Sequence, residues 1–150
     1  MGLLADAPRP RVYLDANLFI YFAEGHPDLS ELVRHVLSAV DDGLMTAATS
    51  ELTVAEVLVR PIRERATRQA DYYRRLITDG PGLSVLPVTR AVLEEGARVR
   101  AVYGIRLPDA IQVATAALSG CDVFLTNDRE LLRVSAVPVC LLSDWSPPCT

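Results

Sequence analysis

Residues 106–131 read RLPDAIQVATAALSGCDVFLTNDREL and decide the fold, because they encode a helix that leads directly into a buried strand. Apolar residues recur through 108–118, and Gly120 is a typical residue at a helix end. The segment 122–126 has the length and apolar character of a strand covered on both faces. Acidic residues stand at the start of the helix (Asp109) and just after the strand (Asp128).

The same alternation of strands and helices extends outward along the chain. Further strands are expected at 11–14, 44–49, 83–88 and 137–142, and further helices at 29–40, from 53 to about 78, and at 90–103. Asp28 is the expected cap of the helix at 29–40, and Pro61 is a possible interruption of the helix that follows. Short apolar strands that alternate with helices predict an α/β fold, a three-layer α/β/α sandwich with a mainly parallel central sheet.

The composition predicts one domain over residues 1–150, with its core at about 11–142. The chain has 150 residues, half of them apolar, which is enough for one well-buried core. Its net charge of −4 argues against binding nucleic acid through a globally basic surface. All 15 basic residues are arginine, so a mechanism that requires a lysine amine is excluded.

The cysteines and the apolar runs predict a soluble, cytoplasmic protein. The three cysteines are far apart and form no C-x-x-C pair, so neither a disulfide framework nor a zinc site is indicated. The leader 1–11 has too short an apolar stretch for a signal peptide. No run approaches the roughly 18 apolar residues that a membrane span requires.

Four acidic residues fall where the predicted fold would gather ligands. Asp15 directly follows the strand at 11–14, Asp128 follows the strand at 122–126, and Glu56 and Asp109 lie in opening turns of helices. Ligands bind beyond the carboxyl ends of strands in such sheets. A set of carboxylates without His or Cys favours Mg²⁺ or Mn²⁺.

Each of these acids also has a purely structural explanation. Glu56 could complete a capping box with Thr53, Asp109 next to Pro108 could serve as a helix-start residue, and Asp128 could be a turn residue. Asp15 is harder to explain in this way, because a carboxylate next to a buried strand loses hydration unless a positive charge compensates it.

Three segments together resemble a known family. They are LDANLFIY (14–21), SELTVAEVLVRP (50–61) and the stretch 106–131 quoted above. In order and spacing they resemble the PIN-domain ribonucleases, in particular the toxin subunits of VapBC-type bacterial toxin–antitoxin systems, over residues 11–142. The resemblance implies a PIN-like fold. It implies a catalytic, metal-binding set of four residues: Asp15, Glu56, Asp109 and Asp128.

The resemblance also implies a reaction, the hydrolysis of phosphodiester bonds in RNA. One or two Mg²⁺ ions, or Mn²⁺ as a substitute, would activate a water molecule, with Glu56 as ligand or base. Asn17, Thr126 and Asn127 would orient carboxylates or bound water. Glu51 is a rival for the glutamate position, but Glu56 directly precedes the apolar run 57–59. Ala16 departs from the Thr or Ser that many relatives carry.

The resemblance implies two protein partners, a second copy of the chain and a cognate antitoxin. The mean hydropathy of +0.21 is consistent with apolar surface that a partner covers, at about 29–40 and 53–76. The arginines between 60 and 75 could guide RNA or could form a solvated helix face.

Other classes of function fit less well. A haloacid-dehalogenase-type phosphotransferase would carry Asp-x-Asp in place of Asp15-Ala16-Asn17, and a receiver-type signalling module would require a lysine. A stand-alone RNA-processing nuclease of the PIN type and a noncatalytic interaction module remain as alternatives.

Overall fold

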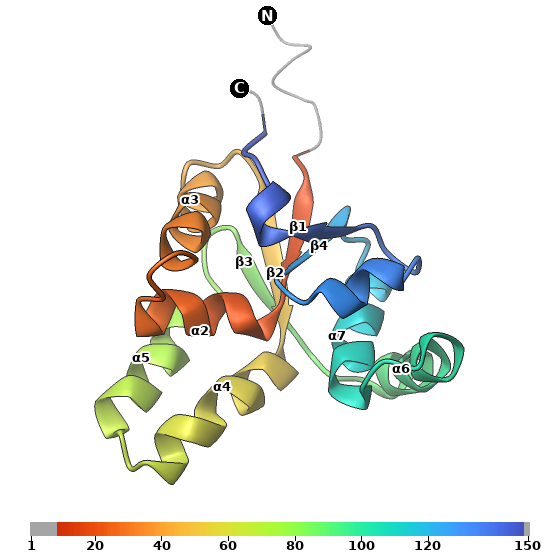
Figure 1. The fold of residues 1–150 in the computed structure, drawn as a ribbon, viewed down its shortest axis with the longest axis horizontal. Coiled ribbons are helices and arrows are strands. Elements are labelled where there is room, and N and C mark those ends of the chain that lie inside the picture. Colours follow the sequence, from red (N-terminus) through yellow and green to blue (C-terminus); the bar gives the residue numbers. More distant parts are fainter. Residues whose placement is uncertain (1–8, 149–150) are drawn as a thin grey trace, which may run out of the picture.

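A five-stranded parallel sheet forms the centre of the computed structural model, which describes residues 9–148 (Figure 1). The strands are β1 (Arg11–Leu14), β2 (Thr46–Ser50), β3 (Leu83–Leu86), β4 (Val123–Thr126) and β5 (Val139–Leu141). Their order is β3-β2-β1-β4-β5, and each neighbouring pair is parallel. The predicted α/β fold is confirmed, and β1 occupies the middle of the sheet.

Helices cover both faces of the sheet, as Figure 1 shows. One layer contains α2 (Ala16–Glu24), α3 (Ser30–Asp41), α4 (Glu51–Arg63) and α5 (Thr67–Leu76). The other contains α6 (Arg90–Tyr103) and α7 (Leu107–Leu118). Two short 3-10 helices, η1 (Arg129–Arg133) and η2 (Leu142–Asp144), follow β4 and β5.

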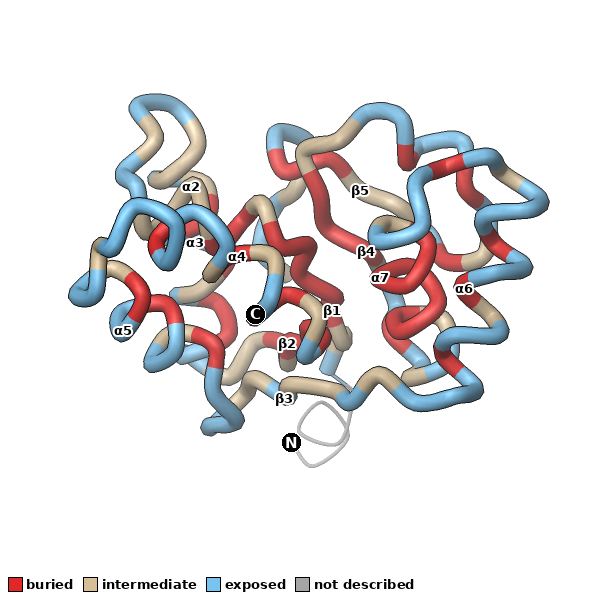
Figure 2. The backbone as a smooth tube through the Cα atoms, turned by 90° about the horizontal axis from the view of Figure 1, so that it is seen from below, coloured by how far each residue is buried: buried red, intermediate tan, exposed pale blue. Residues whose placement is uncertain are grey.

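The alternation of side chains along β1 divides the core into two parts. Val12 and Leu14 pack with α2 and α3, whereas Tyr13 packs with α6 and α7 and stacks on Phe124 of β4. Successive residues of a strand point to opposite faces, so a strand buried on both sides is apolar throughout. Figure 2 shows the resulting continuous burial through the central strands and α7.

Several helix boundaries differ from the prediction. α2 was not expected as a helix, because a short apolar run does not distinguish helix from strand. α4 begins at Glu51, two residues earlier than expected, because the Ser50 side chain caps it by accepting a hydrogen bond from the Leu52 N–H at 3.0 Å. Pro61 lies in the last turn of α4 and does not interrupt it.

The predicted cap at Asp28 is wrong. Nδ1 of His26 accepts hydrogen bonds from the backbone N–H groups of Asp28 and Leu29, at 3.2 and 3.1 Å, where α3 starts. The imidazole therefore fixes the turn before α3, and α3 itself starts after Leu29 without a side-chain cap.

Within the described range, no helix has both the length and the apolar character that crossing a membrane requires. The prediction for the leader falls mostly on residues 1–8, and Cys149 also lies outside the described range.

Candidate active site

Asp15 lies at the carboxyl end of the central strand and is 6% exposed. Its Oδ1 accepts a hydrogen bond from the Ala16 N–H at 2.8 Å, so the carboxylate caps α2. Its Oδ2 accepts a hydrogen bond from the Thr126 hydroxyl at 2.7 Å. The β1–β4 pairing therefore brings a residue from the end of β4 against Asp15.

Burial raises the pKa of Asp15 from its ordinary value of 3.8 to about 7. The hydrogen bonds from Thr126 and Ala16 favour the charged form and oppose this shift, while the negative charges of Asp109 and Glu56 add to it. A neutral residue such as Ser or Asn caps a helix equally well. Capping alone therefore does not explain a carboxylate at this position.

Thr126 connects Asp15 to Asp128. Its hydroxyl donates to Asp15 and accepts a hydrogen bond from the Asp128 N–H at 3.0 Å. The Asp128 carboxylate accepts a hydrogen bond from the Glu130 N–H at 3.0 Å and caps η1. Asn127 makes a different contact from the one expected, because its amide donates to the Tyr21 hydroxyl at 3.3 Å and not to a carboxylate.

Asp109 lies in the first turn of α7, and its side chain is 13% exposed. Burial raises its pKa, and the charges of Asp128 and Glu130 raise it further. Arg106 opposes the shift: its Nε lies 3.3 Å from Oδ2 of Asp109. The Arg106 side chain is 79% exposed, so this ion pair is a weak surface contact.

Glu56 lies in the second turn of α4, half-buried, and its Oε1 accepts a hydrogen bond from Nε2 of Gln112 at 2.7 Å. Burial raises the pKa of Glu56, with a further contribution from the charge of Asp109. Glu51 lies exposed in the first turn of the same helix. Of the two glutamates, Glu56 is the one that interacts with the other acids.

Gln112 is the site residue that the sequence analysis missed. It is fully buried in α7 and contacts Glu56 directly. The available signal was a single amide in a helix whose neighbours, residues 110–116, are otherwise small or apolar. Buried amides require partners.

The four carboxylates are the kind of ligand that a hard divalent cation prefers, although in this structure they do not meet at one point. Within residues 9–148, no three His, Cys, Asp or Glu side chains are grouped closely enough to hold a metal ion. They do raise one another's pKa values, because Coulomb interactions act over longer distances than the roughly 2.1 Å of a Mg²⁺–oxygen bond. Gln112 donates a hydrogen bond to Glu56, and Arg106 contacts Asp109 only through a weak, exposed ion pair.

Asn17 supplies a second observation that fits a cation. Its Oδ1 is buried and, within the described residues, is the one such side-chain atom without a hydrogen-bond partner. Asn17 is two residues from Asp15, in the first turn of α2. A buried oxygen without a donor is costly in a folded protein, and a cation or its bound water would satisfy it.

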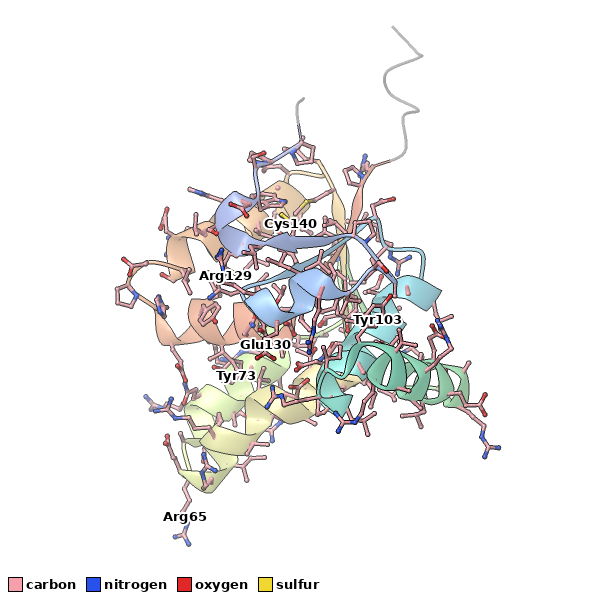
Figure 3. All side chains as sticks on the ribbon, turned by 45° about the vertical axis from the view of Figure 1, so that its right-hand side comes forward. Arg65, Tyr73, Tyr103, Arg129, Glu130 and Cys140 are labelled. Atoms are coloured by element: carbon pink, nitrogen blue, oxygen red, sulfur yellow. The ribbon has the colours of Figure 1, made fainter. Side chains whose placement is uncertain are left out.

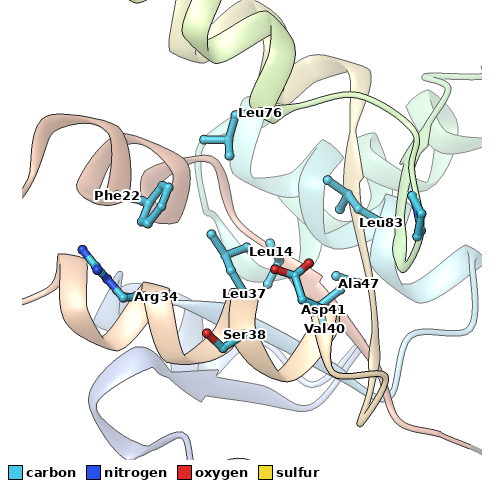
Figure 4. A pocket seen from close by; sticks show the side chains of 11 residues that line it. Leu14, Phe22, Arg34, Leu37, Ser38, Val40, Asp41, Ala47, Leu76 and Leu83 are labelled. Atoms are coloured by element: carbon cyan, nitrogen blue, oxygen red, sulfur yellow. The ribbon is translucent and has the colours of Figure 1, made fainter.

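A pocket of about 320 Å³ lies elsewhere, between α2, α3, the end of α5 and β3 (Figure 4). Its lining is mostly apolar, with Phe22, Leu37, Leu76 and Leu83 among the residues that Figure 4 labels, and Arg34 and Asp41 also contribute. None of the four acids lines this pocket. It is therefore a candidate for binding apolar groups, separate from the carboxylates.

The comparisons with known proteins are consistent on the family. The model of the PIN domain matches residues 12–137. No curated protein matches the chain. Three similar solved structures are VapBC2 of Rickettsia felis bound to a fragment of promoter DNA, a toxin–antitoxin complex from Klebsiella pneumoniae, and VapBC-5 of Mycobacterium tuberculosis.

These structures share the fold at low sequence identity. The TM-scores are 0.71, 0.64 and 0.57, and the identities are 15%, 21% and 21%, in the same order. The matches cover 87%, 84% and 87% of this chain and 98%, 94% and 96% of the matched chains.

Proposed function

The chain belongs to the PIN-domain family, and from that premise we propose that it is a ribonuclease that depends on Mg²⁺ or Mn²⁺. The observation that carries the proposal is the buried carboxylate of Asp15, at the carboxyl end of the central strand, with a pKa raised by burial and by two other acids. A protein that needed only a helix cap would not keep an acid there. A role in catalysis would explain why the protein keeps a buried carboxylate that lowers its stability.

Each of the four acids would have a role in metal binding or in activating water. Asp15, Asp109 and Asp128 would hold the metal, and Glu56 would serve as a further ligand or would orient the attacking water. A bound divalent cation supplies an activated water and neutralises negative charge that develops on the phosphate. Thr126 fixes the Asp15 oxygen, and Asn17, two residues further along the chain, has a buried Oδ1 without a hydrogen-bond partner among the described residues.

Asp15→Asn provides the direct test, with Asp122→Asn as its matched control. Asp122 lies just before β4, at the opposite end of that strand from Thr126, and accepts a hydrogen bond from the Arg11 N–H at 2.7 Å. With single-stranded RNA and Mn²⁺, we expect Asp15→Asn to lose at least about 100-fold in cleavage rate and Asp122→Asn to match the wild type. Wild-type cleavage by the Asp15→Asn protein would overturn the assignment.

We further propose that the chain is the toxin component of a type II toxin–antitoxin system and that it forms a homodimer. Two of the similar structures are described as VapBC proteins and one as a toxin–antitoxin complex, which supports this proposal. The apolar pocket between α2 and α3 would accept side chains of an antitoxin tail. Val59 and Ile62 of α4, 57% and 59% exposed, are apolar surface that a partner would cover.

Induction in bacteria and light scattering test the toxin proposal. We expect growth arrest on induction, a dimer in solution, and relief of both growth arrest and cleavage by the product of an adjacent small gene. A nontoxic monomer that still cuts RNA would contradict the toxin role and favour a stand-alone nuclease. A protein that binds RNA without cutting it would favour an interaction module.

A further inference from the structure

A buried network of hydrogen bonds connects the core of the protein to Glu56. Gln112 is at its centre and makes contacts on both sides of its amide. Oε1 accepts a hydrogen bond from the Tyr13 hydroxyl, and Nε2 donates to Oε1 of Glu56 at 2.7 Å and to Oγ1 of Thr53 at 3.0 Å. Gln112, Tyr13 and Thr53 are all fully buried.

The network continues from Thr53 to the backbone beside Asp15. Oγ1 of Thr53 lies 2.8 Å from Oγ1 of Thr49, and the Thr49 hydroxyl donates to the carbonyl oxygen of Leu14 at 2.9 Å. Leu14 immediately precedes Asp15. The side chain that holds Glu56 is therefore linked to the strand end that carries Asp15.

Each hydroxyl and amide proton of the network can be assigned to one hydrogen bond, so every donor and acceptor in it is determined. Thr49 has a single hydroxyl proton, which goes to Leu14, so the shared proton at 2.8 Å must come from Thr53. Thr53 then accepts from Gln112, and both amide protons of Gln112 are used, one of them on Glu56. The ionised Glu56 carboxylate can only accept, so it disfavours the flipped amide, which would place Oε1 against it; in the observed orientation Oε1 accepts from the Tyr13 hydroxyl.

The amide has partners in the core as well as at Glu56, since an apolar residue at this position would leave the buried Tyr13 and Thr53 hydroxyls each without one hydrogen bond. The core contacts alone do not account for the hydrogen bond to Glu56. That bond fixes one oxygen of a half-buried carboxylate, which otherwise could adopt several rotamers. Groups that orient metal-binding side chains in this way commonly change metal affinity or activity by about 10–100-fold when removed.

We propose that Gln112 is a positioning residue that holds the Glu56 carboxylate in place for metal binding and RNA cleavage. The Tyr13 hydroxyl holds the amide oxygen of Gln112. Thr53 and Thr49 link the Gln112 amide to the strand end that carries Asp15. This inference rests on the proposed function of the site. Gln112 is fully buried and would act on metal and RNA through Glu56.

The test compares Gln112→Met, Tyr13→Phe and the control Tyr103→Phe with the wild type. Met retains the length of Gln without its donor. Tyr103 hydrogen-bonds Ser135 at 2.8 Å, so its variant also loses one tyrosine hydroxyl contact. Calorimetry measures the dissociation constant for Mn²⁺ without RNA, and steady-state kinetics separates kcat from KM.

We expect Gln112→Met to weaken Mn²⁺ binding and to lower kcat by about 10-fold or more, with KM for RNA within twofold. Tyr13→Phe should cause a smaller loss, about threefold, because the amide remains and keeps its contacts to Glu56 and Thr53 but loses the hydrogen bond to its oxygen. Tyr103→Phe should match the wild type in both readouts.

If Gln112 had only a structural role, Gln112→Met would lower the melting temperature but leave the Mn²⁺ affinity and kcat unchanged. That result would overturn the positioning role and leave the proposed function of the site standing. If Gln112→Met fails to fold, Tyr13→Phe decides the question by the same two readouts. A wild-type protein that binds no Mn²⁺ and cuts no RNA would instead overturn the proposed function, and the positioning role with it.

Discussion

At the scale of single residues, Asp15 has the most unusual environment. Its carboxylate is enclosed by β1, β4 and α2, with donors to both oxygens but no basic partner among the groups that set its pKa. Two donors offset only part of the cost of burying a charge. The protein is therefore less stable with this residue ionised than with it protonated.

The stability of the metal-free protein should consequently decrease as the pH rises. The folded-state pKa of Asp15, about 7, lies above its ordinary value of 3.8, so the folded protein binds more protons than the unfolded chain between these two values. The stabilisation is complete below about pH 4 and is lost as the pH rises through 7. The raised pKa values of Glu56 and Asp109 act in the same direction.

Urea denaturation at pH 5.5 and pH 8 with EDTA measures this effect. We expect a higher free energy of unfolding for the wild type at pH 5.5, and a smaller difference between the two pH values for Asp15→Asn. An equal pH dependence in both proteins would show that Asp15 is not the group responsible.

At the scale of elements, α4 provides a comparison between two glutamates on one helix. Glu56 interacts with Gln112 and with the charge of Asp109, whereas Glu51 lies exposed in the first turn. We expect Glu56→Gln to lower the cleavage rate by about 100-fold or more and Glu51→Gln to change it less than twofold. Both proteins should be assayed on the same RNA with Mn²⁺. A larger loss in Glu51→Gln would reverse the assignment of the two glutamates.

The turn before α3 provides a second comparison, between the histidine that binds its backbone and the aspartate that was expected to cap the helix. His26 accepts two backbone hydrogen bonds there, and for Asp28 only the backbone N–H takes part in these contacts. We expect His26→Ala to lower the free energy of unfolding by about 1 kcal/mol and Asp28→Ala to change it by less than about 0.5 kcal/mol. Chemical denaturation at pH 8 checks both values.

The sequence predicted the order of the strands and of the helices other than α2, because the central strands are apolar throughout and most of the helices are amphipathic. It predicted the helix starts less well, since a His26 imidazole nitrogen fixes the turn before α3, which has no side-chain cap, and Ser50 caps α4 two residues before the expected start. Rules based on local sequence patterns do not include a histidine that binds the backbone just before a helix. Gln112 was missed for a related reason: its partners Tyr13 and Glu56 are 99 and 56 residues away, so only the folded chain shows that they meet.

At the scale of the whole molecule, the proposed metal site should contribute to stability. Acids that raise one another's pKa destabilise the folded state, and a cation that binds only the folded state removes this repulsion. At 100 times its dissociation constant, Mn²⁺ should add about 2.7 kcal/mol. This corresponds to an increase of roughly 5–10 °C in melting temperature for a chain of this size.

Thermal melting with and without Mn²⁺ measures this effect, and Asp109→Asn is the control. The variant should melt at the wild-type temperature or above it without metal, and should respond little to Mn²⁺. A folded wild-type protein whose melting temperature did not change in millimolar Mn²⁺ would exclude the acids as a metal site.

The arginines between 60 and 75 lie on α4, on α5 and on the turn that joins them. Figure 3 shows Arg65 at the turn between these helices, pointing away from the body of the protein. Its φ of 57° is the one positive value at a non-glycine residue within the described part of the chain. Arg60 pairs with Glu24 and Glu64, so part of this positive charge is already neutralised.

The position of β1 in the middle of the sheet has a consequence for biosynthesis. β1 is translated first, but Thr126, which bonds Asp15, comes 111 residues later. Contacts between such distant segments form slowly, and domains generally complete their folding as units. The growing polypeptide on a ribosome thus carries its first acidic residues without the fold that brings the four together until β4 and Asp128 have been made. We expect a nascent chain truncated before residue 122 to be digested rapidly by protease and to lack nuclease activity, so that a cell making this protein meets the active form only after β4 has left the ribosome.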